Sequence, residues 1–420
     1  MIQKAKGTYD VFGEYGKRLL YVEELIEGLM EKYNYEYFRT PIFESSNLFH
    51  RGVGETTDIV TKETYDFKDR GNRDLTLRPE GTASIVRSFI ENKMYGNMSE
   101  PVKVYYNGPM FRYERPQSGR QRQFTQFGFE LIGTDDVMSD AEVISLACNT
   151  YKLLGIEPTL IINTLGDTES RNNYRKALID YFTPHIDSLC EDCRERLLKN
   201  PLRILDCKVD DKSEIIKNAP TTLEYLNETS LERFEKLKEY LELMDIDYVV
   251  DTSLVRGLDY YNHTVFEIKA DIPDFGSQAV IGAGGRYNGL VRELDGPDTP
   301  AVGFAMGLDR TILAMESLGI NFNVKDNIDI FIMYGNEEEK ETASYLLQDL
   351  RMNGFVTETD YMGKSFKNQF KSADRFNSKY LIILNNEDIK NYKVKVKDNT
   401  TKEEELVSIN DLVEYLDMKL

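Results

Sequence analysis

The segment Gly108–Glu130 reads GPMFRYERPQSGRQRQFTQFGFE, with apolar and aromatic residues at both ends and a polar, basic middle. The residues just before it, Val102–Tyr106, and its last part, Phe124–Leu131, are rich in β-branched and aromatic side chains, which is typical of strands. Pro116 and Gly119 lie between these two runs and indicate a turn. The sequence therefore predicts a β-hairpin with a basic tip.

The middle of this hairpin holds Arg112, Arg115, Arg120 and Arg122, although the whole chain has a net charge of -20. Guanidinium groups bind phosphate oxygens through paired hydrogen bonds, and Phe124 offers a flat surface for a base. This combination favours a phosphate or a polyanion as the ligand. A surface hairpin whose arginines pair with acidic neighbours is the alternative that four loose arginines would favour.

The composition of the 420 residues, of which 41% are apolar, is that of a soluble protein with two or three domains. The sequence has no apolar run near the length of about 18 residues that spans a membrane, and residues 1–10 lack the basic-then-apolar order of a signal peptide. We therefore expect a cytoplasmic protein with no membrane partner. Because the chain is acidic, any RNA would have to meet local basic patches.

The four cysteines, Cys148, Cys190, Cys193 and Cys207, are too few for a disulfide scaffold in a chain of this length. The pair Cys190-x-x-Cys193 and Cys207 could supply three thiolates to zinc. A structural zinc site needs a fourth ligand, however, and His185 precedes the cysteines instead of following them. The sequence favours a plain reduced loop with no metal, and zinc is the alternative.

Periodicity predicts the main elements of residues 1–325, the expected first domain. Gly13–Asn34 carries apolar side chains at helical spacing. Thr64–Asp69 and Leu75–Leu77 predict the arms of a second hairpin, and Leu254–Glu267 predicts one long strand. Residues from about 167 to 247 have helical spacing and little strand signal, so we expect a helical insertion between strand-rich regions.

Residues 326–420 are expected to form a second domain, which follows a linker at 321–327. Strands and helices alternate there, which predicts a small α/β domain. The expected elements are Ile328–Tyr334, Glu337–Asn353, Val356–Thr359, Ser365–Phe376, Tyr380–Leu384 and Val394–Val396.

Several motifs in a fixed order resemble the class II aminoacyl-tRNA synthetases, and among them the histidyl-tRNA synthetase family. The pattern Phe111-Arg112-x-Glu114 followed by Arg120-x-x-x-Phe124 resembles motif 2 of that class. Tyr35–Ile42 resembles motif 1, and Ala301–Arg310 resembles motif 3. Leu77–Thr82 resembles the Arg-Pro-Glu-Gly-Thr element of the histidyl-tRNA synthetase family, and Arg256–Tyr261 and Ile281–Leu290 resemble its two histidine-specific signatures.

This resemblance implies an α+β catalytic domain with a mainly antiparallel sheet flanked by helices, a helical insertion, and a C-terminal α/β anticodon-binding domain. It implies that L-histidine and ATP form histidyl-adenylate, and that histidine then passes to the 3′ end of a histidine-specific tRNA. Mg²⁺ would accompany the pyrophosphate, and motif 1 implies a homodimer. The alternative is a non-catalytic paralogue, the regulatory subunit of ATP phosphoribosyltransferase, which resembles the same core.

The resemblance also implies roles for arginines in binding ATP. Arg112 and Arg256 would be catalytic and would hold the α-phosphate and the histidine carboxylate. Arg120 and Arg310 would hold the outer phosphates, and Phe124 with Arg310 would enclose adenine. Positive charge at these places suits a reaction that proceeds through positioning and electrostatic stabilisation.

Recognition of histidine requires a partner for each side of its imidazole, which offers one donor and one acceptor when neutral. Glu130 and Tyr261 are the candidates, and the remaining histidine-binding candidates are Tyr260, Tyr287, Glu80, Thr82 and Gln126, of which the last three would take the α-amino group. For Glu80 and Thr82 the alternative is a helix cap. Gln117 at the hairpin tip would face the acceptor end of the tRNA, and its alternative is a solvated turn residue.

Overall fold

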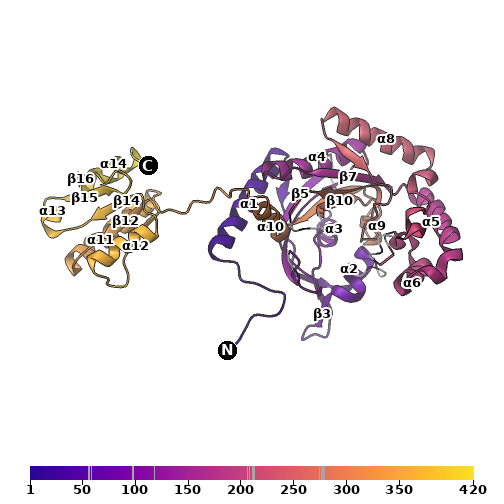
Figure 1. Cartoon of the computed structure of the whole chain (residues 1–420), viewed down its shortest axis with the longest axis horizontal. Helices are drawn as coiled ribbons and strands as arrows, with labels where there is room; N and C mark the ends of the chain where they lie inside the picture. Colours follow the sequence, from indigo (N-terminus) through magenta and orange to yellow (C-terminus); the bar gives the residue numbers. More distant parts are fainter. Residues whose placement is uncertain are drawn as a thin grey trace. The chain divides into compact units, whose positions relative to one another are not determined.

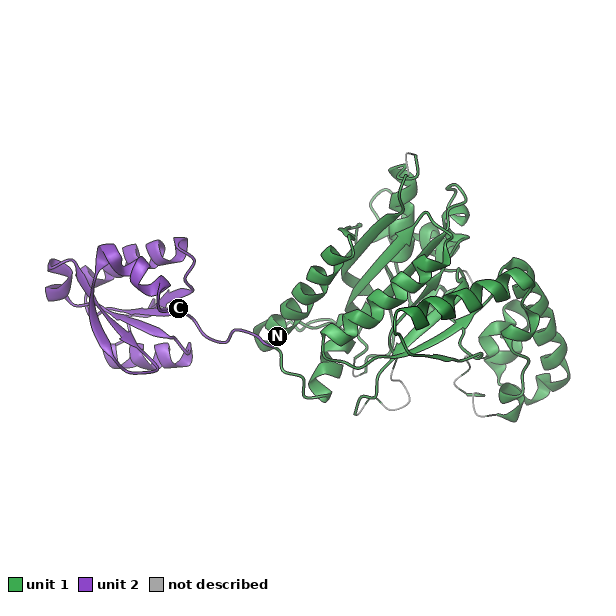
Figure 2. Ribbon diagram, turned by 90° about the horizontal axis from the view of Figure 1, so that it is seen from above, with its two compact units in different colours: residues 1–322 green, residues 323–420 purple. Residues whose placement is uncertain are grey.

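The structure is a computed structural model that describes residues 1–54, 57, 59–96, 99–117, 119–205, 207, 209–210, 213–273, 275 and 280–420. The chain divides into two compact units, residues 1–322 and 323–420 (Figure 2). Among the described residues, every helix is too short or too polar to cross a membrane.

An eight-stranded sheet forms the centre of the first unit (Figure 1). Its strands, in spatial order, are β1 (Glu36–Tyr37), β5 (Val102–Phe111), β6 (Gln123–Ile132), β11 (Ala301–Gly307), β10 (Val280–Arg286), β9 (Asn262–Lys269), β7 (Thr159–Thr164) and β8 (Tyr248–Val250). All pairs from β5 to β7 are antiparallel, and the two outer pairs, β1 with β5 and β7 with β8, are parallel. The predicted mainly antiparallel sheet is confirmed.

The predicted basic hairpin is the β5–β6 pair. Its register runs from Val102 opposite Ile132 to Phe111 opposite Gln123, and Gln117 bridges Arg120 at the tip. Both strands are longer than the sequence indicated. Strand β5 continues through Gly108 and Pro109 to Phe111, and β6 extends by one residue at each end. The four arginines of the tip therefore lie in the segment that connects the ends of two long strands.

Helices cover the two faces of this sheet differently. On one face, α4 (Val137–Leu153) packs through Tyr151 against Phe304 of β11, whose ring stacks on that of Phe266. On the other face, α3 (Thr82–Glu91) packs through Val86 and Phe89 with apolar residues of β5. The remaining helices around the sheet are α1 (Gly13–Lys32), α2 (Ser46–Val53), α9 (Leu290–Glu293) and α10 (Leu308–Ser317).

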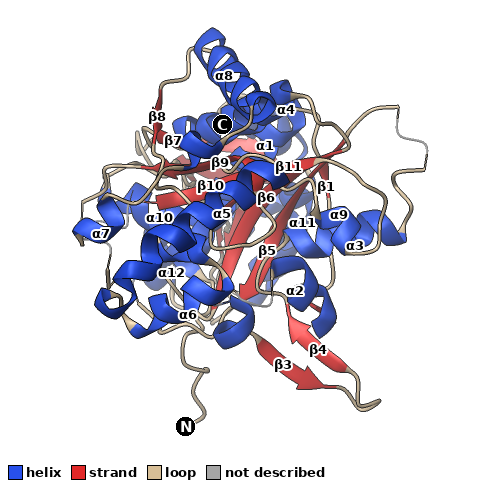
Figure 3. Cartoon of the chain, turned by 90° about the vertical axis from the view of Figure 1, so that its right-hand side faces the viewer, coloured by secondary structure: helices blue, strands red, loops and turns tan. Residues whose placement is uncertain are grey.

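A smaller antiparallel sheet contains β2 (Phe43–Ser45), β4 (Asp74–Leu77) and β3 (Tyr65–Lys68), in that order. Its β3–β4 hairpin extends away from the central sheet (Figure 3). The second predicted hairpin is thereby confirmed. A short π-helix, Ile59–Glu63, precedes it.

The insertion between β7 and β8 is helical. It contains α5 (Thr168–Phe182), α6 (Glu191–Lys199), α7 (Glu214–Lys217) and α8 (Glu228–Leu243), joined in part by 3₁₀ turns at Thr183–Ser188, Pro201–Ile204 and Thr222–Tyr225. Asp167 and Asn227 accept hydrogen bonds from the first turns of α5 and α8, so each helix begins at a side-chain cap. Tyr174, Phe182 and Leu197 belong to a separate core of this insertion.

The prediction of one long strand from Leu254 to Glu267 is wrong in its first half. Only Asn262–Lys269 forms a strand, and residues 254–261 form a loop. The Asn163 side chain donates to the Leu254 carbonyl at 3.0 Å, and the Asp259 backbone N–H donates to the Val53 carbonyl at 3.3 Å. These long-range contacts override the strand preference of the adjacent tyrosines.

The second unit is built on a five-stranded sheet in the order β13 (Thr357–Thr359), β12 (Ile330–Met333), β14 (Tyr380–Ile383), β15 (Lys393–Asp398) and β16 (Glu404–Ser408). The β12 pairs are parallel, and the pairs involving β15 are antiparallel. Helix α11 (Glu337–Met352) packs on the face with Ile330 and Ile332, and α12 (Phe366–Arg375) packs on the face with Phe331 and Met333. Two short helices complete this unit, α13 (Asn386–Lys390) and α14 (Leu412–Asp417).

Candidate active site

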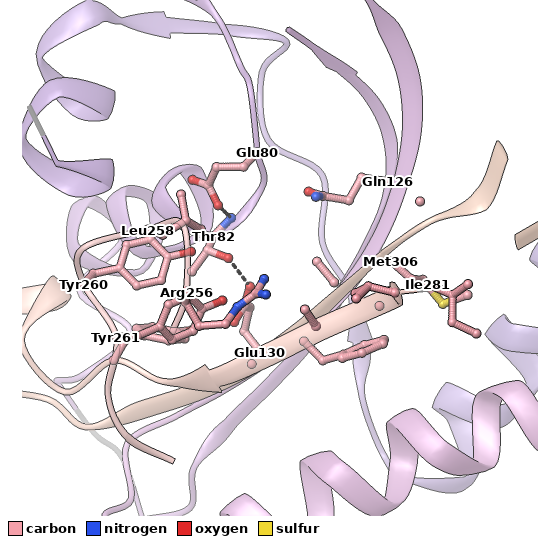
Figure 4. A pocket seen from close by; sticks show the side chains of 18 of the residues that line it. Glu80, Thr82, Gln126, Glu130, Arg256, Leu258, Tyr260, Tyr261, Ile281 and Met306 are labelled. Atoms are coloured by element: carbon pink, nitrogen blue, oxygen red, sulfur yellow. Dashed lines mark hydrogen bonds between the residues drawn. The ribbon is translucent and has the colours of Figure 1, made fainter. Parts of the chain in front are cut away.

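A cavity of about 230 Å³ lies on the α3 face of the central sheet (Figure 4). Strands β6, β10 and β11, the start of α3 and the loop 254–261 provide its lining. The predicted site residues that line it are Glu80, Thr82, Arg112, Phe124, Gln126, Glu130, Arg256, Tyr260, Tyr261 and Tyr287. Residues separated by more than 200 positions in the sequence thus surround one space.

Glu130 lies in the wall of this cavity with only 1% of its surface exposed. The Tyr287 hydroxyl donates to its Oε2 at 2.6 Å, and the Thr82 hydroxyl donates to its Oε1 at 2.7 Å. Burial raises the pKa of Glu130 to about 8, although these two hydrogen bonds act in the opposite direction. Near neutral pH this carboxyl therefore holds a proton that a nearby cation could release.

The position of Glu130 depends on a glycine in the next strand. Gly303 of β11 pairs with Glu130 of β6, and a Cβ atom at Gly303 would lie 1.7 Å from the Glu130 Oε2. Every other residue type would therefore displace the carboxyl group. The segment that resembles motif 3 includes Gly303, but the contact of Gly303 with Glu130 depends on strand pairing that the sequence does not indicate.

Glu80 fixes the beginning of α3. Its carboxylate accepts hydrogen bonds from the backbone N–H groups of Thr82 and Ala83, both at 2.8 Å. The helix-cap interaction that the sequence suggested is therefore made by Glu80, while the Thr82 hydroxyl donates to Glu130. Gln126 joins β6 to the same turn, because its Oε1 accepts from the Gly81 N–H at 3.2 Å.

Arg256 extends from the loop toward the space beside Glu130 (Figure 4). Its Nη1 lies 2.5 Å from Oε1 of Glu267 on β9, and its Cζ lies 5.9 Å from the centroid of the Tyr261 ring. Sequence reasoning missed Glu267. A signal for it existed, because a buried guanidinium requires a carboxylate partner and Glu267 closes the same sequence segment.

Arg112 and Phe124 lie together at the end of the cavity near the hairpin. The Arg112 Nε donates to the Pro79 carbonyl at 2.9 Å, and its Cζ lies 5.3 Å from the centroid of the Phe124 ring. Glu114 lies 4.0 Å from Arg112 and 3.7 Å from Arg120. A carboxylate thus sits between two guanidiniums at a place where a polyanion would compete with it.

Arg120, Arg310 and Gln117 do not line the cavity. The Arg310 Nε donates to the Val280 carbonyl at 2.9 Å, and its Cζ lies 4.7 Å from the Phe275 ring centroid. Burial lowers the pKa of Arg310, and the positive charge of Arg120 lowers it further. The structure therefore brings these two arginines near each other outside the cavity, and it leaves Gln117 exposed at the tip.

A family model described as "Histidyl-tRNA synthetase" matches residues 7–311. The chain belongs to the histidyl-tRNA synthetase family. A second model, described as "Anticodon binding domain", matches residues 329–419. The predicted class II synthetase fold and the C-terminal anticodon-binding domain are both confirmed.

Individual relatives agree with this family assignment. The chain is 49% identical to a histidine–tRNA ligase of Anoxybacillus flavithermus over 99% of this chain and 98% of that protein. It is 48% identical to a histidine–tRNA ligase of Staphylococcus haemolyticus over the whole of both chains. The solved structure of apo histidyl-tRNA synthetase from S. aureus matches with a TM-score of 0.86 and 42% identity, covering 99% of this chain and all of that one. The prediction of a histidine–tRNA ligase is confirmed, and the regulatory-subunit alternative finds no support in these relatives.

Proposed function

We propose that the cavity around Glu130 selects histidine and activates it with ATP before its transfer to tRNA. The observation that carries this assignment is the pairing of Glu130 with Tyr287 and Thr82, with Arg256 beside them. A carboxyl group held by two hydroxyls can accept a hydrogen bond from an imidazole N–H, and Tyr261, which lines the same cavity, would meet the second ring nitrogen.

The α-amino group of histidine would meet oxygen atoms at the start of α3. Glu80, Thr82 and Gln126 line the cavity there, and Glu80 is 3% exposed. Because the Glu80 carboxylate is already held by two backbone N–H groups, it would receive an ammonium group without losing its orientation. An ammonium group near Glu80 and Glu130 also supplies the positive charge that a second buried carboxylate requires.

The two arginines of the cavity act on the reacting groups. Arg256 holds the histidine carboxylate near the α-phosphate, and Arg112 neutralises the charge that develops on that phosphate. An oxygen of the histidine carboxylate attacks the α-phosphorus, and the bond from phosphorus to the pyrophosphate oxygen breaks. The products are histidyl-adenylate and pyrophosphate, and the terminal ribose hydroxyl of the tRNA then attacks the histidyl carbonyl and releases AMP.

The departing pyrophosphate would lie between Arg120 and Arg310. These side chains sit outside the cavity and close enough for the charge of one to lower the pKa of the other. An anion between them would remove that repulsion. Phe124 would contact adenine on one face and Arg310 on the other, as the family resemblance implies.

Mg²⁺ would be carried by the phosphates of ATP. Among the described residues, potential metal ligands converge in groups of three or more at one place. This place is in the helical insertion and not in the cavity. Mg²⁺ binds mainly through phosphate oxygens and water in such sites and needs few protein ligands. When bound, it would neutralise charge on the pyrophosphate.

Histidine-dependent exchange of pyrophosphate into ATP tests this function. The intact chain should catalyse the exchange only when histidine is added. A regulatory paralogue would bind histidine and show no exchange. The domain assignment, 1–325 for catalysis with an insertion at about 167–247 and 326–420 for the anticodon, stays a prediction, as do the cytoplasmic location and Gln117 at the tRNA acceptor end.

The titration of Glu130 predicts a pH-dependent stability. Its pKa is 4.5 in an unfolded chain and about 8 in the folded protein, so the folded state binds more protons between these values. The contribution of Glu130 to the free energy of unfolding should therefore be largest below pH 4.5. It should fall by at most about 1.4 kcal/mol per pH unit between pH 4.5 and pH 8. Glu130→Gln should remove this contribution. Urea unfolding of both proteins at several pH values measures the difference, and a pH-independent difference would contradict the assignment.

We also propose a homodimer, supported by exposed apolar residues near the motif 1 segment. Phe43 is 52% exposed, Phe67 is 41% exposed, and their ring centroids lie 6.2 Å apart on the small sheet. Ile42 is 44% exposed next to them. Light scattering should give twice the mass of one chain, and the double variant Phe43→Ser, Phe67→Ser should shift the mass toward that of one chain. A monomeric wild type would contradict the proposal.

A further inference from the structure

Three cysteines and one aspartate meet in the helical insertion, in the part of the first unit where Figure 1 shows α5 and α6. Cys190 directly precedes α6, and Cys193 lies in its first turn. Cys207 and Asp210 follow the turn Pro201–Ile204. One ligand atom from each of these four residues lies within 4.8 Å of the other three. The cluster therefore joins two segments that are more than ten residues apart in the sequence.

The distances within the cluster suit a shared cation. Cys190 Sγ and Cys207 Sγ are 3.7 Å apart, and Cys207 Sγ and Asp210 Oδ2 are 3.8 Å apart. Zinc–sulfur bonds of about 2.3 Å at tetrahedral angles separate two sulfurs by about 3.8 Å, and a sulfur from an oxygen ligand by about 3.5 Å. A disulfide would require about 2.05 Å. These two separations are therefore close to those expected around one metal ion, and the other pairs lie within 4.8 Å.

Backbone groups already orient the ligands. The N–H groups of Val209 and Asp210 both donate to the Cys207 sulfur at 3.4 Å, and the Cys190 N–H donates to Asp210 Oδ2 at 3.0 Å. Apolar packing would explain neighbouring thiols, since Cys193 is fully buried. It does not explain N–H donors directed at a sulfur, which stabilise a thiolate. A carboxylate beside the sulfurs adds negative charge that a bound cation would balance.

We propose that Cys190, Cys193, Cys207 and Asp210 bind one Zn²⁺ ion in a structural, tetrahedral site. Thiolate-rich sites select zinc, cuprous copper or iron–sulfur clusters, and the carboxylate oxygen favours zinc over the other two. Four protein ligands leave no open position, which is typical of structural sites. The sequence favoured a plain loop because a fourth ligand was missing after Cys207. Asp210 is that ligand.

The proposed site also restrains the loop that carries Arg256. The segment between Cys193 and Cys207 contains Asn200, whose Nδ2 donates to Asp259 Oδ1 at 3.0 Å. It also contains Arg203, which donates to the Gly257 carbonyl and has its Nε 3.8 Å from Asp259 Oδ1. Because Gly257 and Asp259 lie between Arg256 and Tyr260, a metal that fixes this segment would also fix the histidine-binding loop.

Metal content of the full-length protein tests the site. After loading with Zn²⁺ and desalting, we expect about one zinc per chain by mass spectrometry of the metal. Cys190→Ser and Asp210→Asn change partly exposed side chains and should lower the zinc content several-fold while retaining the circular dichroism of the wild type. Cys148→Ser is the matched control, because Cys148 is the one cysteine outside the cluster, and its zinc content should not change.

Cobalt gives an independent readout. Co²⁺ in a tetrahedral thiolate site produces intense visible absorption and sulfur-to-cobalt charge-transfer bands, and both should disappear in Cys207→Ser. Octahedral cobalt spectra, zinc-free wild-type protein, or a disulfide between Cys190 and Cys207 in protein purified under reducing conditions would each overturn the proposal.

The connection to the loop rests on the proposed function and is measured separately. Removing zinc by a chelator should raise the KM for histidine several-fold and leave the KM for ATP nearly unchanged. Asn200→Ala should raise the histidine KM in the same direction while the zinc content stays at one per chain. If the protein binds one zinc per chain but its histidine KM does not change when the zinc is removed, the connection to the loop is wrong and the metal site is still supported. Loss of exchange in every zinc-loaded protein would instead contradict the proposed function.

Discussion

Replacing Arg256 with alanine should reduce histidine-dependent pyrophosphate exchange by about 100- to 1,000-fold. Arg256 extends from the loop into the cavity, where its guanidinium lies near Glu130 (Figure 4). A donor that stabilises developing charge typically contributes a factor of this size to the rate. Exchange rates measured at saturating histidine and ATP would reveal the loss, and retained exchange would remove Arg256 from the mechanism.

The structural effect of this substitution can be separated from the chemical one. Arg256→Ala leaves Glu267, which is 15% exposed, without the partner 2.5 Å away, and an unpaired carboxylate in such a place destabilises the fold. The double variant Arg256→Ala, Glu267→Gln removes that charge. It should therefore recover thermal stability and still lack exchange. If the double variant regained activity, the role of Arg256 would be structural.

An arginine elsewhere in the same unit provides a matched control. Arg292 on α9 is 67% exposed and lies 3.7 Å from the equally exposed Asp298. Surface pairs of this kind contribute little to stability. Arg292→Ala should change neither exchange nor thermal stability measurably, so a large effect there would show that the assay reports a general loss of protein.

The predicted residues that line the cavity share one property, which is that a local pattern or a motif indicated them. The β5–β6 hairpin was predictable because Pro116 and Gly119 lie between two strand-like runs. Glu267 was missed because the fold brings it to Arg256. Asp210 was missed because, although it lies only three residues after Cys207, the fold brings it to Cys190. The need of Arg256 for a carboxylate partner pointed to Glu267, but residue spacing alone does not distinguish either carboxylate from the many solvated ones in an acidic chain.

The loop 254–261 shows the same limit for secondary structure. Tyrosine and β-branched residues favour strands, so the segment looks like one strand from the sequence. In the structure, hydrogen bonds with the Asn163 side chain and the Val53 carbonyl hold its backbone as a loop, and Tyr260 and Tyr261 are buried in the lining of the cavity. The family resemblance therefore indicated these two tyrosines, whereas the local strand preference did not predict the loop that presents them.

Glu130→Ala should raise the KM for histidine by about 10- to 100-fold and change the KM for ATP by less than about threefold. The loss corresponds to about 1.5–3 kcal/mol for a hydrogen bond to a charged or strongly polar group. Glu130 is assigned to histidine, whereas Arg112 and Phe124, which contact each other in the lining of the same cavity, are assigned to ATP. Equal effects on both KM values would contradict the assignment of Glu130 to histidine.

Gly303→Ala tests the same assignment without changing the carboxyl group. The new Cβ would lie 1.7 Å from the Glu130 Oε2, so it should displace Glu130 and raise the histidine KM in the same selective way. In the double variant Glu130→Ala, Gly303→Ala the conflict with the carboxyl group is absent, and the closest remaining contact of the new Cβ is the Phe129 carbonyl oxygen at 3.0 Å. Its histidine KM should therefore equal that of Glu130→Ala, far below the product of the two single effects. Multiplying effects would mean that Gly303 acts independently of Glu130, and the geometric account of histidine selection would then be wrong.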